Sequence, residues 1–305
     1  MCIEKKMITF VQLGKHGRLG NQLYQYAALR GISEKVGVEC KIPDFKNFFW
    51  HGQKCLLDNF NINADTYNDD DIAAIEKNII EPDASVFYED FFSIPDSSNI
   101  HGFFQFTKYF DHCEELIREE LRPKDSFLSE AKKELDSYRQ DGHEIVSIHI
   151  RRGDMMTVMY PNTGIHPDQV YGPDDIFDDS TIYGSYLNKA MSMFSDKKVK
   201  YLVFSGGNRG TDDSSDINYI SRVFNDDRFI ISDSNDPMRD FSLMMSCDHN
   251  ISCHQTSFGW WASYMNDNEN RIVTAPQHYY FEMPREKSDA RISNGTFPPG
   301  WTIIE

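Results

Sequence analysis

The stretch HEIVSIHIRRGD, residues 143–154, begins as an alternating strand and ends in two arginines, a glycine and an aspartate. Successive side chains of a strand point to opposite faces, so Val146, Ile148 and Ile150 share one face while Ser147, His149 and Arg151 share the other. Arg152 then begins the following turn. In open α/β sheets, ligands bind beyond the carboxyl ends of the strands. The stretch therefore predicts a buried strand of an α/β sheet with a cationic site at its end.

These arginines are informative because the chain as a whole is acidic. Its 305 residues carry a formal net charge of −17, with 40% hydrophobic and 26% charged residues. This length can bury the core of one large domain or two ordinary ones, and the composition is typical of a soluble globular protein. An acidic chain is a poor partner for nucleic acid or an anionic membrane, so we expect no nucleic-acid partner.

The apolar segments and the cysteines indicate the cellular location of the protein. The N-terminal MCIEKKMITFVQLG is too short and too β-like for a signal peptide, and no later segment reaches the roughly 18 apolar residues of a membrane span. The six cysteines have no CxxC spacing, which favours free thiols over a disulfide or zinc framework. We therefore predict a cytoplasmic protein without a membrane span; weak peripheral association with the inner membrane face stays open.

The second half of the chain alternates predicted strands and helices. The strands are expected at 145–150, 200–207, 228–232, 249–253 and 271–276, and the helices at 185–195, 216–224, 236–247 and 258–265. This alternation predicts a parallel, Rossmann-like sheet. The insert at 155–180 is the longest stretch without predicted structure, and long loops of this kind often carry function.

The first half opens in the same way. A strand at 7–13, a glycine-rich turn, a helix from 21 to 37 and a second strand at 38–43 are the start of another parallel α/β sheet. A turn at 141–143 marks the expected boundary. We therefore expect an N-terminal α/β domain at 1–140 and a Rossmann-like domain at 141–285. For the C-terminal tail at 286–305, packing back on the first domain is one option.

Two adjacent arginines at the end of a buried strand predict an anion clamp, most simply for a diphosphate. A guanidinium matches phosphate oxygens in a planar, two-pronged geometry. The plainer alternative is a structural ion pair, such as Arg152 with Asp154. That alternative has more weight for Arg152 than for Arg151.

The glycine-rich turn GKHGRLG, at 14–20, matches neither the dinucleotide fingerprint nor the phosphate-binding P-loop. A glycine turn before a helix still allows a ligand to approach closely, and a helix N-terminus favours negative charge. Asn21 and Gln22 would add donors and acceptors there. A purely structural strand-to-helix turn is equally consistent with this pattern.

The segment CHQTSFGWW, at 253–261, places hydroxyl groups between a strand and an aromatic helix. Thr256 and Ser257 occupy the expected N-cap and first turn of that helix, a position that also suits a phosphate. Helix capping alone would explain them equally well. Trp260 and Trp261 are adjacent and cannot share a helix face, so we expect one in the core and the other lining a cleft.

Together these stretches resemble the bacterial α-1,2-fucosyltransferases. The chain has GRLGNQLYQYA near its start, HIRRGDM at mid-chain, and DFSLMMSC followed by TSFGWW, with RIVTAP and PPGWTII near its end. The resemblance spans nearly the whole chain. It implies a GT-B-like α/β fold, in which two Rossmann-like domains face a central cleft. It also implies GDP-L-fucose as donor substrate, inversion at the anomeric carbon, and neither cofactor nor metal; the only Asp-x-Asp is inside the DDD run at 69–71.

The resemblance also suggests roles for individual residues. Arg151 would bind the diphosphate, and Asn21 would face the fucosyl group. The other expected donor contacts are His149, Arg152, Ser205, Asn208, Thr256, Ser257, Arg18 and Gln22.

Two roles are not settled by the motifs. The chain has FSGGNRGTDD at 204–213 where relatives often show F-S-D-D. Either Asn208, Asp212 or Asp213 would then read the guanine, or the backbone would do so. The base that takes the acceptor proton is Asp154, His166 or Asp168, and Asp154 could instead orient its loop. We count Asp154 among the catalytic candidates.

Two other classes of protein remain as alternatives. A Rossmann-type dehydrogenase would use the first glycine turn, and a non-catalytic carbohydrate-binding protein would stack sugars on Trp50, Trp260 or Trp261. For a transferase, the resemblance suggests a terminal β-galactoside acceptor in an oligosaccharide or surface polysaccharide. The loops at 46–60 and 155–180 would select it.

Overall fold

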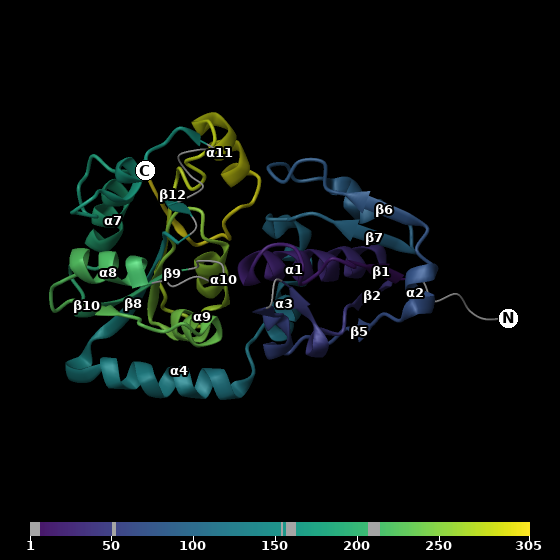
Figure 1. The fold of residues 1–305 in the computed structure, drawn as a ribbon, viewed down its shortest axis with the longest axis horizontal. Helices are drawn as coiled ribbons and strands as arrows, with labels where there is room; N and C mark the ends of the chain where they lie inside the picture. Colours follow the sequence, from purple (N-terminus) through teal and green to yellow (C-terminus); the bar gives the residue numbers. More distant parts are fainter. Residues whose placement is uncertain (1–6, 51–52, 154, 157–162, 207–213) are drawn as a thin grey trace. The chain divides into compact units, whose positions relative to one another are not determined.

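The computed structural model describes residues 7–50, 53–153, 155–156, 163–206 and 214–305. The chain divides into two compact units (Figure 1). Unit 1 comprises Met1–Lys124 and Ala290–Pro298, and unit 2 comprises Asp125–Asp289 and Pro299–Glu305. Each unit is built around its own parallel sheet.

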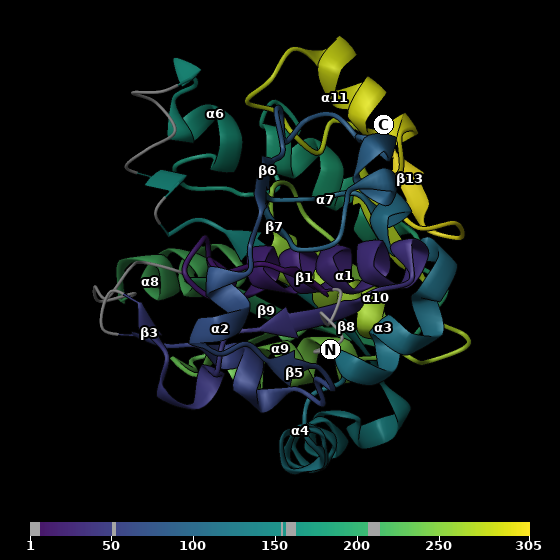
Figure 2. The same ribbon diagram turned by 90° about the vertical axis from the view of Figure 1, so that its right-hand side faces the viewer.

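Unit 1 contains a five-stranded sheet with the strand order β5-β2-β1-β7-β6, in which every pair is parallel. Helix α1 packs on β1 and β2 (Figure 2) and ends at Gly37, whose φ of 76° suits a glycine C-cap. The strands are β1 (Met7–Thr9), β2 (Glu39–Ile42), β5 (Asp65–Thr66), β6 (Lys77–Ile80) and β7 (Ser98–His101), with a small hairpin of β3 (Phe49–Trp50) and β4 (Gln53–Lys54). The helices are α1 (Leu19–Val36), α2 (Asp69–Ala73) and α3 (Glu114–Glu120).

Two features of unit 1 differ from the sequence prediction. Strand β1 ends at Thr9 because the chain turns immediately, with the N–H of Leu13 donating to the carbonyl of Phe10. Strands β6 and β7 were not predicted, since KNII and SNIH lack the alternation of a half-buried strand. Even so, β7 lies beside the central β1, and the hydroxyl of its buried Ser98 donates to the carbonyl of Pro95.

Unit 2 contains a six-stranded parallel sheet with the order β10-β9-β8-β11-β12-β13. Counted along the chain, this order is 3-2-1-4-5-6, which is the Rossmann order and confirms the predicted class. The order reverses between β8 and β11. The strands are β8 (Glu144–Arg151), β9 (Val199–Gly206), β10 (Phe229–Ile231), β11 (His249–Ile251), β12 (Val273–Pro276) and β13 (Thr302–Ile304).

Helices cover both faces of this sheet (Figure 1). Helices α7 and α8 pack on the face that carries Val146, Ile148 and Ile150. Helices α9 and α10 lie on the other face, where Asn250 donates to the hydroxyl of Ser147 and to the carbonyl of Met244. The alternation read from the sequence is thus confirmed. The helices of unit 2 are α4 (Asp125–Tyr138), α6 (Pro167–Tyr171), α7 (Ile182–Ser192), α8 (Ser214–Val223), α9 (Pro237–Ser246) and α10 (Ser257–Met265). Helix α11 (Arg285–Ser293) is divided between the two units.

The compact units place the first boundary before α4 and divide the expected C-terminal tail between them. Helix α4 belongs to unit 2, because Glu134 and Arg139 bond to Arg239 and Asp248. The segment Ala290–Pro298 belongs to unit 1, where Gly295 accepts a hydrogen bond from the N–H of Thr107. The insert at 155–180 is also not structureless, since α6 forms within it.

None of the helices in the described part of the chain combines the length and the apolar character needed to cross a membrane. The cysteines in this part of the chain are free thiols: Cys40, Cys55, Cys113, Cys247 and Cys253.

Candidate active site

The reversal of strand order in unit 2 brings two predicted motifs together. Strands β8 and β11 are parallel neighbours, with Ile148 opposite Ile251. Their carboxyl ends therefore lie at the same edge of the sheet. Arg151 ends β8, and the segment 252–256 leads from β11 into α10. This edge, at the reversal point, is where α/β sheets bind ligands.

One hydrogen-bonded pair joins the two motifs. Nδ1 of His149 lies 2.5 Å from the hydroxyl oxygen of Thr256. That oxygen also accepts from the N–H of Gly259 at 3.0 Å, so Thr256 caps α10 as predicted. A Cβ at Gly259 would lie 3.2 Å from the His149 ring. The glycine therefore lets the N-terminus of α10, with its partial positive charge, approach the end of β8.

Two side-chain hydroxyl groups fix the backbone at the end of β8. The hydroxyl of Tyr171 donates to the carbonyl of Arg151, and the hydroxyl of Ser205 donates to the carbonyl of Ile150 at 3.0 Å. Gly206 lies opposite Arg151 in the sheet. Arg151 therefore projects from a fixed strand end, on the face that alternation gives to His149.

Arg152 forms an ion pair with a buried carboxylate of unit 2. Its Nη1 lies 2.6 Å from Oδ1 of Asp216, whose side chain is only 2% exposed. Its guanidinium also lies over the ring of Tyr219, 4.2 Å from the centroid. The structure thus shows a structural ion pair of Arg152 with Asp216, whereas Asp154, the partner considered from the sequence, lies outside the described residues. This ion pair holds the start of α8, and the contact of Arg152 with a diphosphate stays a prediction.

The segment between β11 and α10 carries strain and unpaired polar atoms. Gln255 has a φ of 51°, in the left-handed region that non-glycine residues rarely adopt. Its buried amide oxygen and nitrogen have no hydrogen-bond partner among the described residues. Burial, and then His278, lowers the pKa of His254 to about 3, so this imidazole is neutral. Strain of this kind is typical of ligand sites.

The tryptophans do not behave as predicted. Trp260 is 1% exposed and Trp261 0%. Both lie in the core, because the aromatic helix is covered on all sides, with the Trp260 ring stacked on Tyr264 and packed on Trp301. Neither indole can serve as a platform for a sugar.

In the sheet of unit 1, β1 has β2 on one side and β7 on the other, and the strand order reverses at β1. The glycine turn therefore leaves the sheet at its reversal point. Gly17 has a φ of 79°, and a Cβ there would lie 2.6 Å from Nδ2 of Asn21. Gln22 is buried and its Nε2 donates to the carbonyls of Gly14 and Gly17. Gln22 thus holds the turn together, which differs from the predicted contact with the ligand.

Asn21 takes part in a hydrogen-bonded chain that the sequence did not indicate. It is the third residue of α1, whose N-cap is Arg18, so Asn21 is not the cap. Its Oδ1 accepts from Nε2 of Gln105 at 2.9 Å, and Oε1 of Gln105 accepts from Nη2 of Arg291 at 2.8 Å. These three residues are far apart in the chain, and no motif contains Gln105 or Arg291.

Aromatic rings lie at the same edge of unit 1. The His16 ring packs against His101 and Phe103, with centroids 4.9 and 4.5 Å away. Burial, and then His101, lowers the pKa of His16. Its imidazole is therefore neutral at pH 7.

Some predicted residues lie outside the described part of the chain. These are Asp154, Asn208, Asp212 and Asp213, together with the side chain of Trp50. Of the other base candidates, His166 caps α6 through its ring, which accepts the N–H of Asp168 at 3.3 Å. Both side chains are about half exposed. Among the residues that the structure describes, no three His, Cys, Asp or Glu side chains are grouped to hold a metal.

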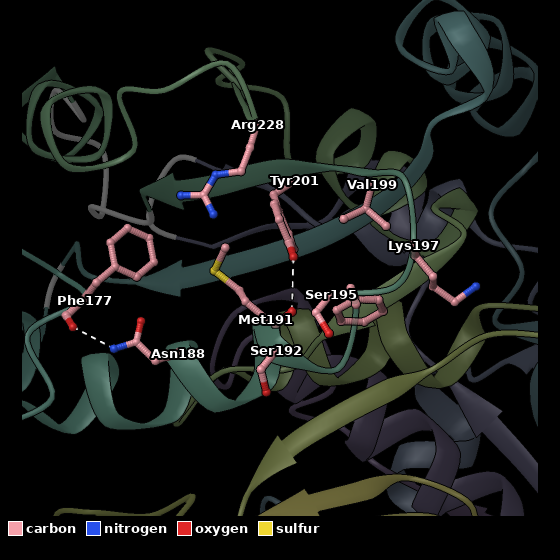
Figure 3. A pocket seen from close by; sticks show the side chains of 10 residues that line it. Phe177, Asn188, Met191, Ser192, Ser195, Lys197, Val199, Tyr201 and Arg228 are labelled. Atoms are coloured by element: carbon pink, nitrogen blue, oxygen red, sulfur yellow. Dashed lines mark hydrogen bonds between the residues drawn. The ribbon is translucent and has the colours of Figure 1, made fainter.

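A hollow of about 560 Å³ lies elsewhere in unit 2 (Figure 3). It is lined by the end of α7, the first residues of β9, and Arg228, which precedes β10 and is bonded to Asp226. The amino ends of β9 and β10 are at the edge of the sheet opposite the reversal-point residues. The hollow is therefore separate from the candidate site.

Comparison with known proteins gives the family. The chain matches glycosyl transferase family 11 over residues 3–305. It is 26% identical to galactoside alpha-(1,2)-fucosyltransferase 1 of Rattus norvegicus, over 94% of this chain and 71% of that protein. It is also 26% identical to an alpha-1,2-colitosyltransferase of Escherichia coli, over 95% of this chain and 97% of that protein.

The fold has solved counterparts. The chain resembles POFUT1 in complex with GDP-fucose, with a TM-score of 0.51 and 11% identity, over 89% of this chain and 98% of that one. The fold is thus GT-B-like, with two parallel α/β units. The family match, in turn, shows that the protein is a glycosyltransferase. Its fold, its reversal-point motifs and the match along nearly its whole length agree: the chain belongs to glycosyl transferase family 11.

Proposed function

We propose that this enzyme transfers L-fucose from GDP-β-L-fucose to the 2-hydroxyl of a terminal β-galactoside. The observation that carries the proposal is the edge of unit 2 where β8, ending in Arg151, meets the N-terminus of α10 through His149 and Thr256. The name of the rat relative, a galactoside alpha-(1,2)-fucosyltransferase, supports the sugar and the linkage. The GDP-fucose complex of POFUT1, which shares the fold, supports the nucleotide.

In this proposal, unit 2 stabilises the leaving group. The acceptor oxygen bonds to the anomeric carbon of fucose while the bond to the β-phosphate oxygen breaks, so the anomeric carbon is inverted and negative charge grows on GDP. Arg151 and the N-terminus of α10, with Thr256 and Ser257, would take up that charge, and no metal would be needed. His149, placed beside Thr256, would assist.

In unit 1, Asn21 and Arg18 would contact the transferring sugar or its acceptor. Gln22 would act indirectly, because its amide holds the glycine turn. The base that receives the acceptor proton would be Asp154, His166 or Asp168. Of these, His166 already uses its ring to cap α6.

A second donor is favoured by one specific observation. The E. coli relative, which matches over 97% of its own length, is a colitosyltransferase. Colitose is fucose without its 3-hydroxyl. A site that bonds this hydroxyl discriminates strongly against the deoxy sugar, because its buried polar group would be left unpaired. The ratio of kcat/KM for GDP-fucose over GDP-colitose therefore decides between the two donors.

For location we propose the cytoplasm, based on the free thiols of the described cysteines. The acceptor would be an oligosaccharide or a surface polysaccharide. Weak attachment to the inner membrane face is part of this proposal and can be tested by co-sedimentation with vesicles.

A ligand screen tests the nucleotide first. At about 100 times its dissociation constant, a ligand stabilises the folded state by roughly 2.7 kcal/mol. GDP alone should raise the melting temperature of the protein, whereas NAD alone or free oligosaccharide alone should not. Transfer from labelled GDP-fucose to β-galactosides then tests the reaction. Stabilisation by NAD alone, or transfer only to a site other than the 2-hydroxyl, would overturn the proposal.

A further inference from the structure

We propose that Arg291 and Gln105 are positioning residues that fix the polarity of the Asn21 amide. They make Asn21 present its N–H₂ group, and not its oxygen, to an oxygen atom of the sugar substrate. This inference rests on the proposed function, in which Asn21 contacts the transferring sugar or its acceptor.

The argument starts from the chemistry of arginine. A guanidinium has five N–H donors and no acceptor. The group that Nη2 of Arg291 meets at 2.8 Å must therefore be the carboxamide oxygen of Gln105. That choice turns Nε2 of Gln105 toward Asn21, and at 2.9 Å it requires the oxygen of Asn21 as its acceptor. Carboxamide orientation is often ambiguous, but here a donor-only residue sets both amides.

The consequence appears at the ligand edge of unit 1. With its oxygen directed to Gln105, Asn21 directs Nδ2 away from that residue. Nδ2 lies against the glycine turn, since a Cβ at Gly17 would be only 2.6 Å from it. This turn follows β1 at the reversal point of the sheet. In the proposed function, these amide hydrogens would be donated to a ring oxygen, hydroxyl oxygen or glycosidic oxygen of the sugar.

The chain of three residues is rigidly supported. Arg291 is 6% exposed, and its guanidinium lies 5.4 Å from the centroid of the Phe106 ring. The loop that carries Gln105 is held by the Glu81 carboxylate, which accepts from the N–H of Phe103 at 2.7 Å and of Phe104 at 3.1 Å.

Phe104 has a φ of 52°, a strained value for a bulky residue. Strain of this kind persists only where the surroundings over-determine the backbone. The loop is thus built to place Gln105.

The substitution Gln105→Glu tests the orientation of the Asn21 amide without changing the shape of the residue that sets it. A carboxylate keeps the shape of the Gln105 side chain and strengthens its bond to Arg291, but it has no hydrogen to donate. Asn21 must then turn its N–H₂ toward the new carboxylate and its oxygen toward the substrate. We expect kcat to fall by about 10- to 100-fold, in line with the loss of one substrate hydrogen bond and the facing of two acceptors. The melting temperature and the affinity for GDP should stay at the unsubstituted level or above it.

Two further variants test the arginine. Arg291→Lys retains a donor-only group and should recover more turnover than Arg291→Met, which leaves the Gln105 amide without direction. Thr107→Val is the matched control. It removes the 3.2 Å bond from the Thr107 hydroxyl to the carbonyl of Gly295, which joins the same two segments, and the 3.3 Å bond to Asp111. Neither bond reaches Asn21. Its kcat should be unchanged.

A double-mutant cycle separates positioning from simple support. In the Asn21→Ala background, Gln105→Glu should cost little further, because it acts through Asn21. An equal cost in both backgrounds, or normal turnover of Gln105→Glu, would overturn the inference while leaving the proposed function intact. Normal turnover of Asn21→Ala itself would instead remove Asn21 from the proposed site, and this inference with it.

Discussion

The hydroxyl oxygen of Thr256 lies 2.5 Å from Nδ1 of His149 and also accepts the N–H of Gly259. One buried hydroxyl therefore joins the end of β8 to the N-terminus of α10 at the reversal point of the sheet. The anion-binding end of the helix is held beside the strand that ends in Arg151.

Removing this hydroxyl should affect both stability and turnover. We expect Thr256→Val to destabilise the protein by about 1 kcal/mol through the lost cap, and also to weaken GDP binding. Thr181→Val is the matched control, since the Thr181 hydroxyl caps α7 through the N–H of Gly184 at 3.0 Å. That control should lose a similar amount of stability but keep its affinity for GDP. Equal GDP affinities in both variants would argue against a phosphate site at α10.

Arg151→Ala should nearly abolish transfer while the fold survives. Loss of a contact with charge that develops in the transition state lowers kcat by about 100- to 1,000-fold, and Arg151→Lys should recover little because an ammonium lacks the two-pronged geometry. Arg152→Ala provides a contrast. It strands the buried Asp216 carboxylate and should mainly lower the melting temperature. Normal turnover of folded Arg151→Ala would refute the assignment.

Asn21→Asp should separate turnover from nucleotide binding. An aspartate keeps an acceptor for Nε2 of Gln105 but removes the hydrogens offered to the sugar. We expect a strong fall in kcat with nearly unchanged GDP affinity, the pattern of an interaction made mainly in the transition state. Because Asn21 does not occupy the N-cap position of α1, the melting temperature should change little. Weak GDP binding with normal kcat would place the nucleotide on the glycine turn instead.

Asp240 should make stability depend on pH. Burial raises the pKa of this carboxyl to about 7, although the Ser232 hydroxyl donates to it. A pKa raised above the unfolded value of 3.8 stabilises the folded state at low pH. That contribution is lost as the pH rises from about 4 through about 7, and each pH unit within this range removes at most about 1.4 kcal/mol.

Between pH 5 and 8, the melting temperature should therefore fall more steeply in the unsubstituted protein than in Asp240→Asn. The general effect of the negative net charge is common to both proteins. If the melting temperatures of the two proteins fell in parallel with pH, Arg239 would be keeping the Asp240 carboxylate ionised, since its Nη1 lies 3.7 Å from Oδ1 of Asp240.

Transfer should persist in excess EDTA. The proposed charge compensation comes from Arg151 and the N-terminus of α10, both of which are part of the polypeptide. Initial rates with and without the chelator should agree, with added manganese and magnesium as controls. Complete loss that either metal restores would contradict this prediction.

The sequence alone determined the features that depend on local geometry. The parallel α/β class followed from the alternation of strand and helix patterns, because each pattern reflects the period of its own element. The cap at Thr256 and the glycine end of α1 followed from backbone groups within one helical turn. The position of Arg151 at a strand end followed from the two-residue period of β8.

The tertiary structure alone decided which distant side chains meet. Arg152 bonds to Asp216, and Asn21 is oriented by Gln105 and Arg291. Neither partnership leaves a local pattern, since strand order and loop packing bring these residues together. Burial of both tryptophans was likewise decided by the elements that surround α10. Local backbone geometry can be read along the chain, whereas hydrogen bonds between distant residues depend on packing that exists only in the folded protein.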